Sequence, residues 1–400
     1  MSTKPDTKIK VVGVGGSGGN GISRMMKCNI RGVELVAINA DAQDLQRAKA
    51  HSKVRIGRNL TKGLGTGMNP DIGRAAAEEQ KEEIEEVLRG ADMVFIACGL
   101  GGGCGSGASS VVAEIAKKSG ALTLAVVTTP FSFEGIHRSE IAQASLKRLK
   151  GKVDTLIAIS NNKLLSVLEP KTTIINAFWY CDEILMQAVQ GISDLIVLPG
   201  IINIDFADLK TILKGQGGAL FFSQVFAAGP TRIEEATKAI FQASPLQEAP
   251  SNVKCILFNV AGGKDLKIKE VESISRKVAS LNDKAKIIFG VSQLPQYNGK
   301  LKVSLLALSQ DGLKEKRIMK AEKGKFKEKN NGQQKIKNGK TKDKFKKEKE
   351  TAVSKEQAQK NKVKRRSALE VKKEEKEAEE IEWSGEREWE IPAFLRSKQN

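Results

Sequence analysis

Apolar runs alternate with amphipathic stretches along the first half of the chain. The runs are short and rich in Val, Ile and Leu, which is typical of strands buried on both faces of a parallel sheet. They predict strands over residues 9–14, 33–38, 93–98, 122–128 and 155–159. The stretches between them have helical spacing and predict helices over residues 19–28, 75–88, 108–118 and 139–150. Strands that alternate with helices indicate an α/β fold with a parallel sheet covered on both faces.

A long helical repeat separates this half from a smaller mixed α/β unit. The repeat predicts one central helix over residues 174–195. A loop leads from it into a further helix within PGIINIDFADLKTIL, and a glycine-rich segment follows at 215–219. The remaining pattern predicts helices over 233–243 and 269–280 and strands over 254–260, 285–291 and 301–308. We therefore expect a first domain over 1–173, the central helix, and a second domain over 196–312.

Two glycine-rich segments each follow a predicted strand and open a predicted helix. The first, GVGGSGGN, occupies residues 13–20, and the second, GLGGGCGSG, occupies residues 99–107. Glycine lets backbone N–H groups approach an oxyanion closely, and a helix N-terminus adds partial positive charge. Both segments fall at the carboxyl ends of strands, where parallel sheets bind ligands. The pattern predicts a phosphate site, and two segments indicate a nucleotide.

The first segment alone also fits a dinucleotide site. It satisfies G-x-G-x-x-G, and Asp41 lies 23 residues after Gly18, where an acid can hold a ribose hydroxyl. A dinucleotide domain does not need the second segment, and neither segment carries the lysine of a P-loop. Two such segments favour a triphosphate held by backbone N–H groups. An NAD-dependent Rossmann enzyme that uses only the first segment stays open as an alternative.

Charge and cysteine content limit the other classes of function. Residues 314–366 hold 22 basic and 7 acidic side chains, and residues 313–388 have too few apolar residues to offset chain entropy, so we expect a charged, disordered linker there. Its aromatic side chains are sparse, which argues against nucleic-acid binding. The five cysteines show no paired spacing, so neither a zinc site nor disulfides are expected. The sequence contains no run of about 18 apolar residues, so membrane insertion is not predicted. We expect a cytoplasmic protein.

Six phrases carry a resemblance to a known family. They are GVGGSGGN, INADAQ, GLGTGMNPDIG, GGGCGSG, PFSFEG and VQGISDLIVLPGIINIDFAD. Together they make about residues 8–312 resemble FtsZ, the bacterial tubulin homologues that hydrolyse GTP. The resemblance implies a tubulin/FtsZ-like fold with a Rossmann-like GTPase domain, GTP or GDP with Mg²⁺ as ligands, and head-to-tail protofilaments that scaffold the division ring at mid-cell.

The resemblance also implies site residues. Those for the nucleotide are Gly15, Gly16, Ser17, Gly18, Gly19, Asn20, Asn39, Asp41, Gly67, Asn69, Gly101, Gly102, Gly103, Cys104, Gly105, Ser106, Gly107, Glu134, Arg138, Asn161, Phe178 and Asp182. The last three match positions around the guanine base, where an Asp or Asn can pair with N1–H and N2–H₂ and a Phe can stack. Without the resemblance, Phe178 could equally be a core residue and Asp182 a solvated helix charge.

Asn203, Asp205 and Asp208 form a second candidate group, in INIDFAD. From the residues alone, helix capping explains them, with Asp205 as N-cap and Asp208 in the first turn. The resemblance implies that they are catalytic. They would enter the nucleotide pocket of the adjacent subunit and polarise the attacking water with the help of a metal, so that hydrolysis depends on assembly.

Several positions depart from the family pattern. The family phrase is GGGTGTG, so Cys104 brings a weaker donor than a hydroxyl, and a filament scaffold with little GTP turnover is a further alternative. Phe221 to Gln224 replace a small-residue stretch, and we expect the larger side chains to alter the subunit contact. The last segment, residues 389–400, contains IPAFLR, which resembles the family's partner-binding peptide. It predicts that Ile391 to Arg396 bind a membrane-anchoring division adaptor.

Overall fold

The computed structural model describes residues 7–28, 30, 32–165, 168–197, 200–214, 220–241 and 253–309. The predicted glycine-rich segment at 215–219, the linker and the segment from Ile391 to Arg396 lie outside the described residues, so those predictions stay predictions. In the part of the chain that is described, no helix combines the length and apolar character needed to cross a membrane.

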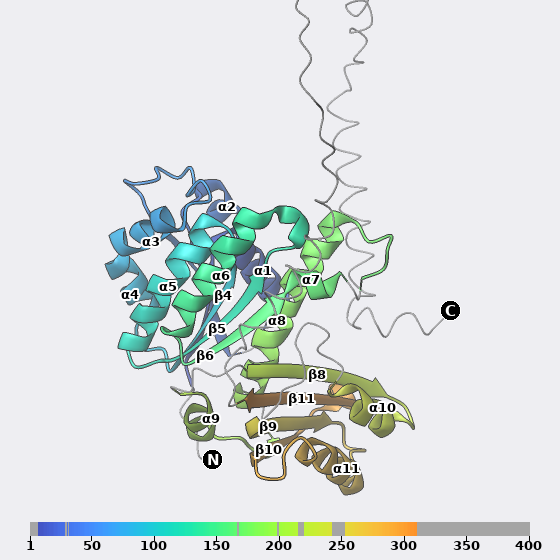
Figure 1. Cartoon of the computed structure of the whole chain (residues 1–400). Coiled ribbons are helices and arrows are strands. Elements are labelled where there is room, and N and C mark those ends of the chain that lie inside the picture. Colours follow the sequence, from blue (N-terminus) through green and yellow to red (C-terminus); the bar gives the residue numbers. More distant parts are fainter. Residues whose placement is uncertain are drawn as a thin grey trace, which may run out of the picture. The chain divides into compact units, whose positions relative to one another are not determined.

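A six-stranded parallel sheet organises the first domain (Figure 1). Its strand order is β3-β2-β1-β4-β5-β6. The strands are β1 (Ile9–Val14), β2 (Val33–Asn39), β3 (Ser52–Arg55), β4 (Met93–Gly99), β5 (Leu122–Thr129) and β6 (Thr155–Ser160). This confirms the predicted parallel α/β sheet. The additional edge strand β3 has only four residues, of which Val54 alone is buried, so it leaves no apolar run to detect.

The helices of the first domain begin earlier than predicted. They are α1 (Gly15–Lys27), α2 (Ala42–Arg47), α3 (Pro70–Glu79), α4 (Lys81–Leu88), α5 (Gly103–Lys118), α6 (Ile136–Lys150) and α7 (Asn161–Leu164), with a 3₁₀ turn, η1, at Ser132–Glu134. Much of each glycine-rich segment is therefore the first turns of a helix and not a preceding loop. The single helix predicted over 75–88 is two helices, because the chain leaves helical geometry at Gln80.

A long helix, α8 (Ile174–Val197), leads to a five-stranded mixed sheet with strand order β7-β10-β9-β11-β8. Its strands are β7 (Gly200–Ile202), β8 (Leu220–Ala228), β9 (Val253–Gly262), β10 (Lys286–Gln293) and β11 (Lys300–Ser309). The helices are α9 (Phe206–Leu213), α10 (Arg232–Ala239) and α11 (Ile268–Ala279), with a 3₁₀ turn at Pro295–Tyr297. Strands β9 and β10 run parallel, and the other pairs are antiparallel.

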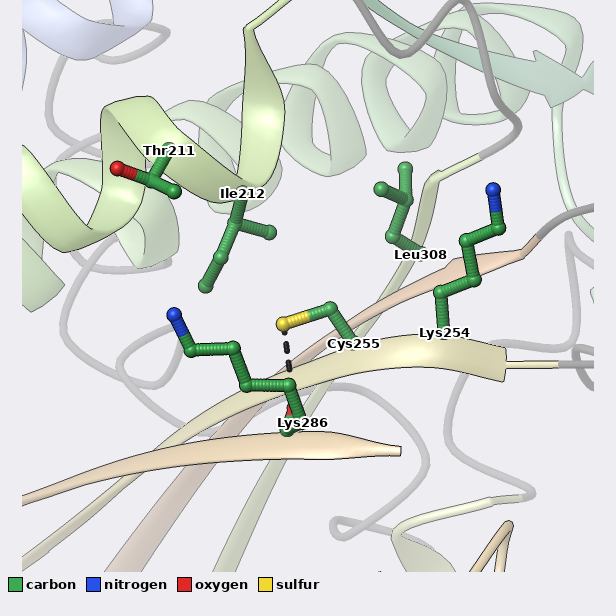
Figure 2. Close-up of a pocket in the computed structure, with 6 residues that line it drawn as sticks. All are labelled: Thr211, Ile212, Lys254, Cys255, Lys286 and Leu308. Atoms are coloured by element: carbon green, nitrogen blue, oxygen red, sulfur yellow. Dashed lines mark hydrogen bonds between the residues drawn. The ribbon is translucent and has the colours of Figure 1, made fainter. Parts of the chain in front are cut away.

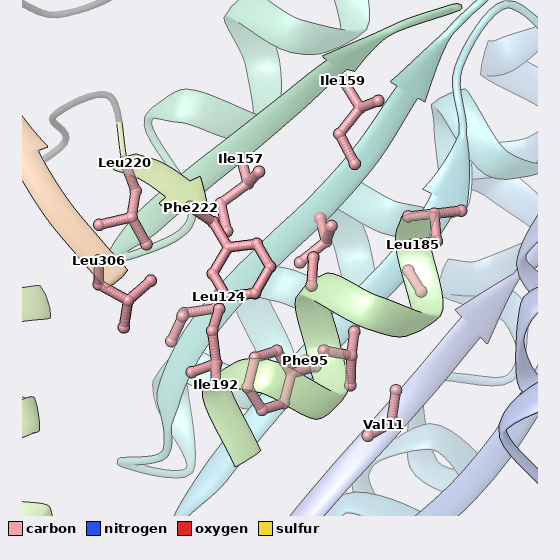
Figure 3. Close-up of a cluster of buried hydrophobic side chains, with 14 of the residues drawn as sticks. Val11, Phe95, Leu124, Ile157, Ile159, Leu185, Ile192, Leu220, Phe222 and Leu306 are labelled. Carbon is pink, nitrogen blue, oxygen red and sulfur yellow. The ribbon is translucent and has the colours of Figure 1, made fainter. Parts of the chain in front are cut away.

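The helix α8 shares one hydrophobic core with both sheets. Figure 3 shows Phe95 and Leu124 of the first sheet, Ile192 of α8, and Phe222 and Leu306 of the second sheet in the same cluster. Burying such side chains contributes about 1.5–3 kcal/mol each relative to an exposed position. The core thus ties α8 to the strands on either side of it.

The expectation that Phe221 to Gln224 alter a subunit contact is wrong for the two aromatic residues. Phe221 and Phe222 are 4% and 9% exposed, inside the chain. The ring of Phe222 lies against Gly191 of α8, so closely that a Cβ at Gly191 would collide with it. The larger side chain fills space that a glycine leaves open within the same molecule.

Candidate active site

The two glycine-rich segments meet at the carboxyl edge of the first sheet. Gly15 has φ +75°, a conformation that glycine adopts without strain. A Cβ built on it would lie 2.9 Å from the backbone nitrogen of Gly105, so the first turns of α1 and α5 are in close contact. The midpoints of the two segments are about 86 residues apart in the sequence. The structure brings the segments together because the strands that precede them, β1 and β4, are neighbours in the sheet.

Packing explains some of these glycines without a ligand. A Cβ on Gly18 would lie 2.5 Å from the carbonyl oxygen of Ala97, and one on Gly105 would lie 2.5 Å from that of Gly99. Gly103 and Gly107 meet the backbone at the start of α3 in the same way. Real Cβ atoms do not approach backbone so closely, so these glycines let the helices pack against the strands and each other.

Other glycines border open space. A Cβ on Gly102 or Gly67 would meet nothing within 4 Å, and one on Gly19 would first meet Ala48 at 3.7 Å. Gly67 and Gly101 also have positive φ, at 54° and 103°. Space beside the backbone at the start of a helix is what an anionic ligand needs. The sequence pattern thus combines packing glycines with glycines that leave room for a phosphate.

Two side chains within the second segment face inward. The hydroxyl oxygen of Ser106 is buried and accepts a hydrogen bond from the backbone N–H of Gly101 at 2.9 Å, which braces the turn. Burial raises the pKa of the Cys104 thiol to about 11. At neutral pH, Cys104 is therefore a neutral thiol and can supply only a weak donor.

Three predicted nucleotide ligands also shape the turns that hold them. Asp41 is the N-cap of α2, and its Oδ1 accepts from the backbone N–H groups of Gln43 and Asp44. Asn69 caps α3 in the same way, through Oδ1. Asn39 Oδ1 accepts from the N–H of Asp41 at 3.2 Å. Such caps stabilise a helix by about 1 kcal/mol, so these residues have a structural role whether or not they touch a ligand.

Glu134 and Arg138, two of the predicted nucleotide ligands, form an ion pair beside the second segment. Arg138 donates to Glu134 Oε2 at 2.6 Å, and Glu134 Oε1 accepts from the backbone N–H of Phe131 at 2.8 Å. A Cβ on Gly101 would lie 3.0 Å from the carbonyl oxygen of Arg138, so the start of α6 borders the second glycine-rich segment.

Two of the three residues predicted around the base, Asn161 and Asp182, are buried polar groups. Asn161 is 5% exposed, and its Oδ1 has no hydrogen-bond partner among the residues that the structure describes. A buried acceptor left unpaired costs about 1–3 kcal/mol, which favours a site completed by a ligand. Burial raises the pKa of Asp182 to about 7, against the opposing charge of Arg24. Phe178 is exposed and lies edge-on to Phe131, with ring centroids 5.4 Å apart.

The second candidate group, Asn203, Asp205 and Asp208, lies around the start of α9. Asp205 is the N-cap of α9 and Asp208 lies in its first turn, as capping predicted, although the Asp205 side chain makes no capping hydrogen bond. The far end of α9 is fixed to the first sheet, because Thr155 Oγ1 donates to the carbonyl of Leu213 at 3.0 Å. Thr155 begins β6, so this contact is at the amino edge of the sheet, about 20 Å of strand from the carboxyl edge. The structure therefore does not bring Asn203, Asp205 and Asp208 to the glycine turns of their own chain.

The comparisons with known proteins fit this arrangement. The model for "Tubulin/FtsZ family, GTPase domain" matches residues 8–169, and that for "FtsZ family, C-terminal domain" matches residues 222–310. The chain is 42% identical to FtsZ from M. jannaschii, solved as an empty dimer, with a TM-score of 0.71 over 77% of this chain and 89% of that one. The chain belongs to the FtsZ family.

Two other solved structures resemble this FtsZ-family chain in fold. CetZ2 from Haloferax volcanii, a GTPγS-bound protofilament, is 22% identical with a TM-score of 0.66, over 78% of this chain and 96% of that one. CetZ1 from the same organism, a GDP-bound monomer, is 21% identical with a TM-score of 0.67, over 76% and 95%. The family match confirms the predicted fold and makes the first domain a GTPase domain that binds GTP or GDP.

Arg24 and Trp179 lie beside Asp182, one of the predicted base contacts, and the sequence did not single them out. The guanidinium of Arg24 lies over the Trp179 ring, 4.3 Å from its centroid, and its Nε is 3.8 Å from Asp182 Oδ2. Helical spacing offered a signal, because Arg24 follows Asn20 by four residues and Trp179 precedes Asp182 by three. Neither signal says which two helices face each other.

A separate hollow lies in the second domain. Figure 2 shows the six side chains that line it: Thr211, Ile212, Lys254, Cys255, Lys286 and Leu308. Its volume is about 180 Å³, and the Cys255 thiol donates to the Lys286 carbonyl at 3.1 Å. None of the predicted nucleotide or catalytic residues lines it.

Proposed function

We propose that this protein hydrolyses GTP when its copies assemble head to tail, and that the filaments scaffold the division ring at mid-cell. The placement of the two residue groups carries the proposal. The glycine turns lie at the carboxyl edge of the first sheet, whereas α9, with Asp205 and Asp208, is fixed to the amino edge. A catalytic site that needs both groups requires two subunits, and a heterologous contact of this kind propagates into an open filament.

Exposed apolar side chains support such a contact. Leu64 and Ile136, beside the proposed pocket, are 87% and 69% exposed, and Ile201, two residues before Asn203, is 68% exposed. Burial of such side chains between subunits would favour association. The M. jannaschii FtsZ dimer and the CetZ2 protofilament are assemblies of related chains, which also supports self-association here.

In this proposal the nucleotide residues divide by task. Backbone N–H groups at the starts of α1 and α5 hold the phosphates, and Asn161 and Asp182 accept from the guanine edge. The partner subunit's acids orient and polarise the attacking water. Mg²⁺ is usually bound through nucleotide phosphates and water, so we propose that it arrives with GTP, where it would neutralise charge on the phosphate oxygens.

The test is phosphate release from GTP and Mg²⁺ as the concentration of the full chain is raised, with light scattering recorded in parallel. We expect turnover per subunit to be negligible below a critical concentration and to rise above it together with the scattering. Turnover per subunit that does not depend on concentration would place all catalytic groups in one chain. Scattering without turnover would favour the scaffold alternative.

The peptide from Ile391 to Arg396 is proposed to attach the filaments to a membrane-anchored adaptor, across the charged linker. Deletion of residues 389–400 is expected to leave assembly unchanged by light scattering and to abolish recruitment of the tagged protein to the membrane, seen by fluorescence microscopy. Recruitment that survives the deletion would assign the attachment to another part of the chain.

A further inference from the structure

Three side chains form a cluster between α1 and α8. Arg24 extends from α1 and lies over Trp179 of α8, with 4.3 Å from the guanidinium carbon to the ring centroid. Asp182, one helical turn beyond Trp179, is 8% exposed, and its Oδ2 is 3.8 Å from Arg24 Nε. The cluster adjoins Phe178 and the proposed base end of the pocket.

Arg24 acts on Asp182 mainly through its charge. A separation of 3.8 Å is longer than a good hydrogen bond, and the positive charge of Arg24 lowers the pKa of Asp182 more than hydrogen bonding does. Stacking of the flat guanidinium on an indole ring is favourable and restricts where the guanidinium can lie. Trp179 thus keeps the cation near Asp182.

We propose that Trp179 is a positioning residue, which holds Arg24 so that Asp182 stays an ionised acceptor for guanine. The inference rests on the proposed function, because it places guanine against Asp182. Guanine offers two adjacent donors, N1–H and N2–H₂, and an ionised carboxylate offers two acceptors. A protonated carboxyl group loses one of them, so guanine binding requires the ionised form.

Burial and the charges around Asp182 set the pH range in which its carboxylate is ionised. Burial raises the pKa of Asp182 to about 7, and Arg24 lowers it from what burial alone would give. The other titratable groups that interact within this cluster are Glu183 and Cys181 on α8, Cys28 just after α1, and Glu134 on η1. Because the ligand selects the ionised form, affinity is expected to rise with pH through 7 and to level off above it.

Loss of the indole should shift this profile to higher pH. If Arg24 moves away, its stabilisation of the carboxylate weakens and the pKa of Asp182 increases. For a shift of one pKa unit, affinity falls about tenfold at pH 6 and less than twofold at pH 9. General damage to the pocket would instead weaken binding by a similar factor at every pH.

The experiment is calorimetric titration of the full chain with GDP from pH 6 to pH 9. GDP avoids hydrolysis, and its own titration cancels between variants. We expect Trp179→Leu to shift the affinity profile upward in pH and Trp179→Phe, which keeps an aromatic face, to restore most of it. Phe241→Leu is the matched control, because it removes a ring 5.8 Å from the Lys277 ammonium in the second domain, and its profile should follow the wild type.

Two results would overturn the inference alone: a Trp179→Leu profile that overlays the wild type, or one weakened equally at all pH values. A wild-type chain that binds no GDP at any pH would overturn the proposed function as well. If Trp179→Leu does not fold, as judged by thermal unfolding, Arg24→Met makes the same test and should shift the profile in the same direction.

Discussion

The Asp208→Ala variant is expected to lose GTP turnover while keeping its own nucleotide pocket. Asp208 lies in the first turn of α9, which is fixed to the opposite edge of the sheet from the glycine turns. Loss of a group that polarises the attacking water should lower kcat by about 10²–10⁴-fold. GDP affinity should change by less than about twofold, because the substitution does not reach the pocket of the same chain. Phosphate release above the critical concentration and calorimetric GDP binding measure the two effects.

Mixing variants tests whether the site is shared. Asp182→Ala should lose nucleotide binding but still carry Asp208. In an equal mixture with Asp208→Ala, about one contact in four pairs a sound pocket with a sound acid, so about a quarter of wild-type turnover should return. Glu272→Ala, an exposed acid on α11, is the matched control and should hydrolyse GTP normally. Wild-type turnover in Asp208→Ala alone would remove α9 from the mechanism.

The Gly18→Ala variant is expected to lose both stability and GDP binding. Its Cβ would lie 2.5 Å from the carbonyl oxygen of Ala97 and 2.8 Å from the carbonyl carbon of Gly13. These are backbone atoms of β4 and β1, so relief requires α1 to move away from the sheet. Overpacking of this kind costs about 1–3 kcal/mol, and the shift would also displace the N–H groups proposed to hold the phosphates. Urea unfolding and calorimetric binding report the two losses.

Gly21→Ala is the matched control for this prediction, since Gly21 lies on the same helix and a Cβ there would meet nothing within 4 Å. Alanine is the better helix former by up to about 1 kcal/mol, so stability should be unchanged or higher. Wild-type stability in Gly18→Ala would contradict the packing explanation. Normal stability with lost binding would show that Gly18 serves the ligand alone.

The sequence predicted the first sheet well because its strands are buried on both faces. A continuous apolar run such as Met93 to Cys98 has no other ready explanation, and the structure makes it β4. Glycine is a poor helix former, so local propensity predicts that the two helices begin only at residues 19 and 108, late in or after the glycine-rich segments. In the structure, contact with neighbouring backbone, as at Gly18 and Gly105, holds them at the starts of helices. Local propensity cannot reveal such long-range packing.

Only part of the candidate site could be predicted from the sequence. Strand-end position located the two glycine segments on one edge, because all strands of a parallel sheet run the same way. The unpaired oxygen of Asn161 and the stacking of Arg24 on Trp179 depend on which helices become neighbours. The match of Asp41 and Asn69 to family motifs predicted ligand contacts and did not predict that both residues cap helices.

The attachment of α9 to the start of β6 gives any head-to-tail filament two chemically different ends. The terminal subunit at one end presents a nucleotide pocket that no neighbour's acids reach, and the terminal subunit at the other end exposes Asp205 and Asp208 to water. Under the proposed mechanism, GTP in the open pocket is hydrolysed only after the next subunit has been added, so hydrolysis in each subunit begins when a neighbour covers its pocket. Subunits covered earlier in such a filament would therefore hold more GDP than those covered later.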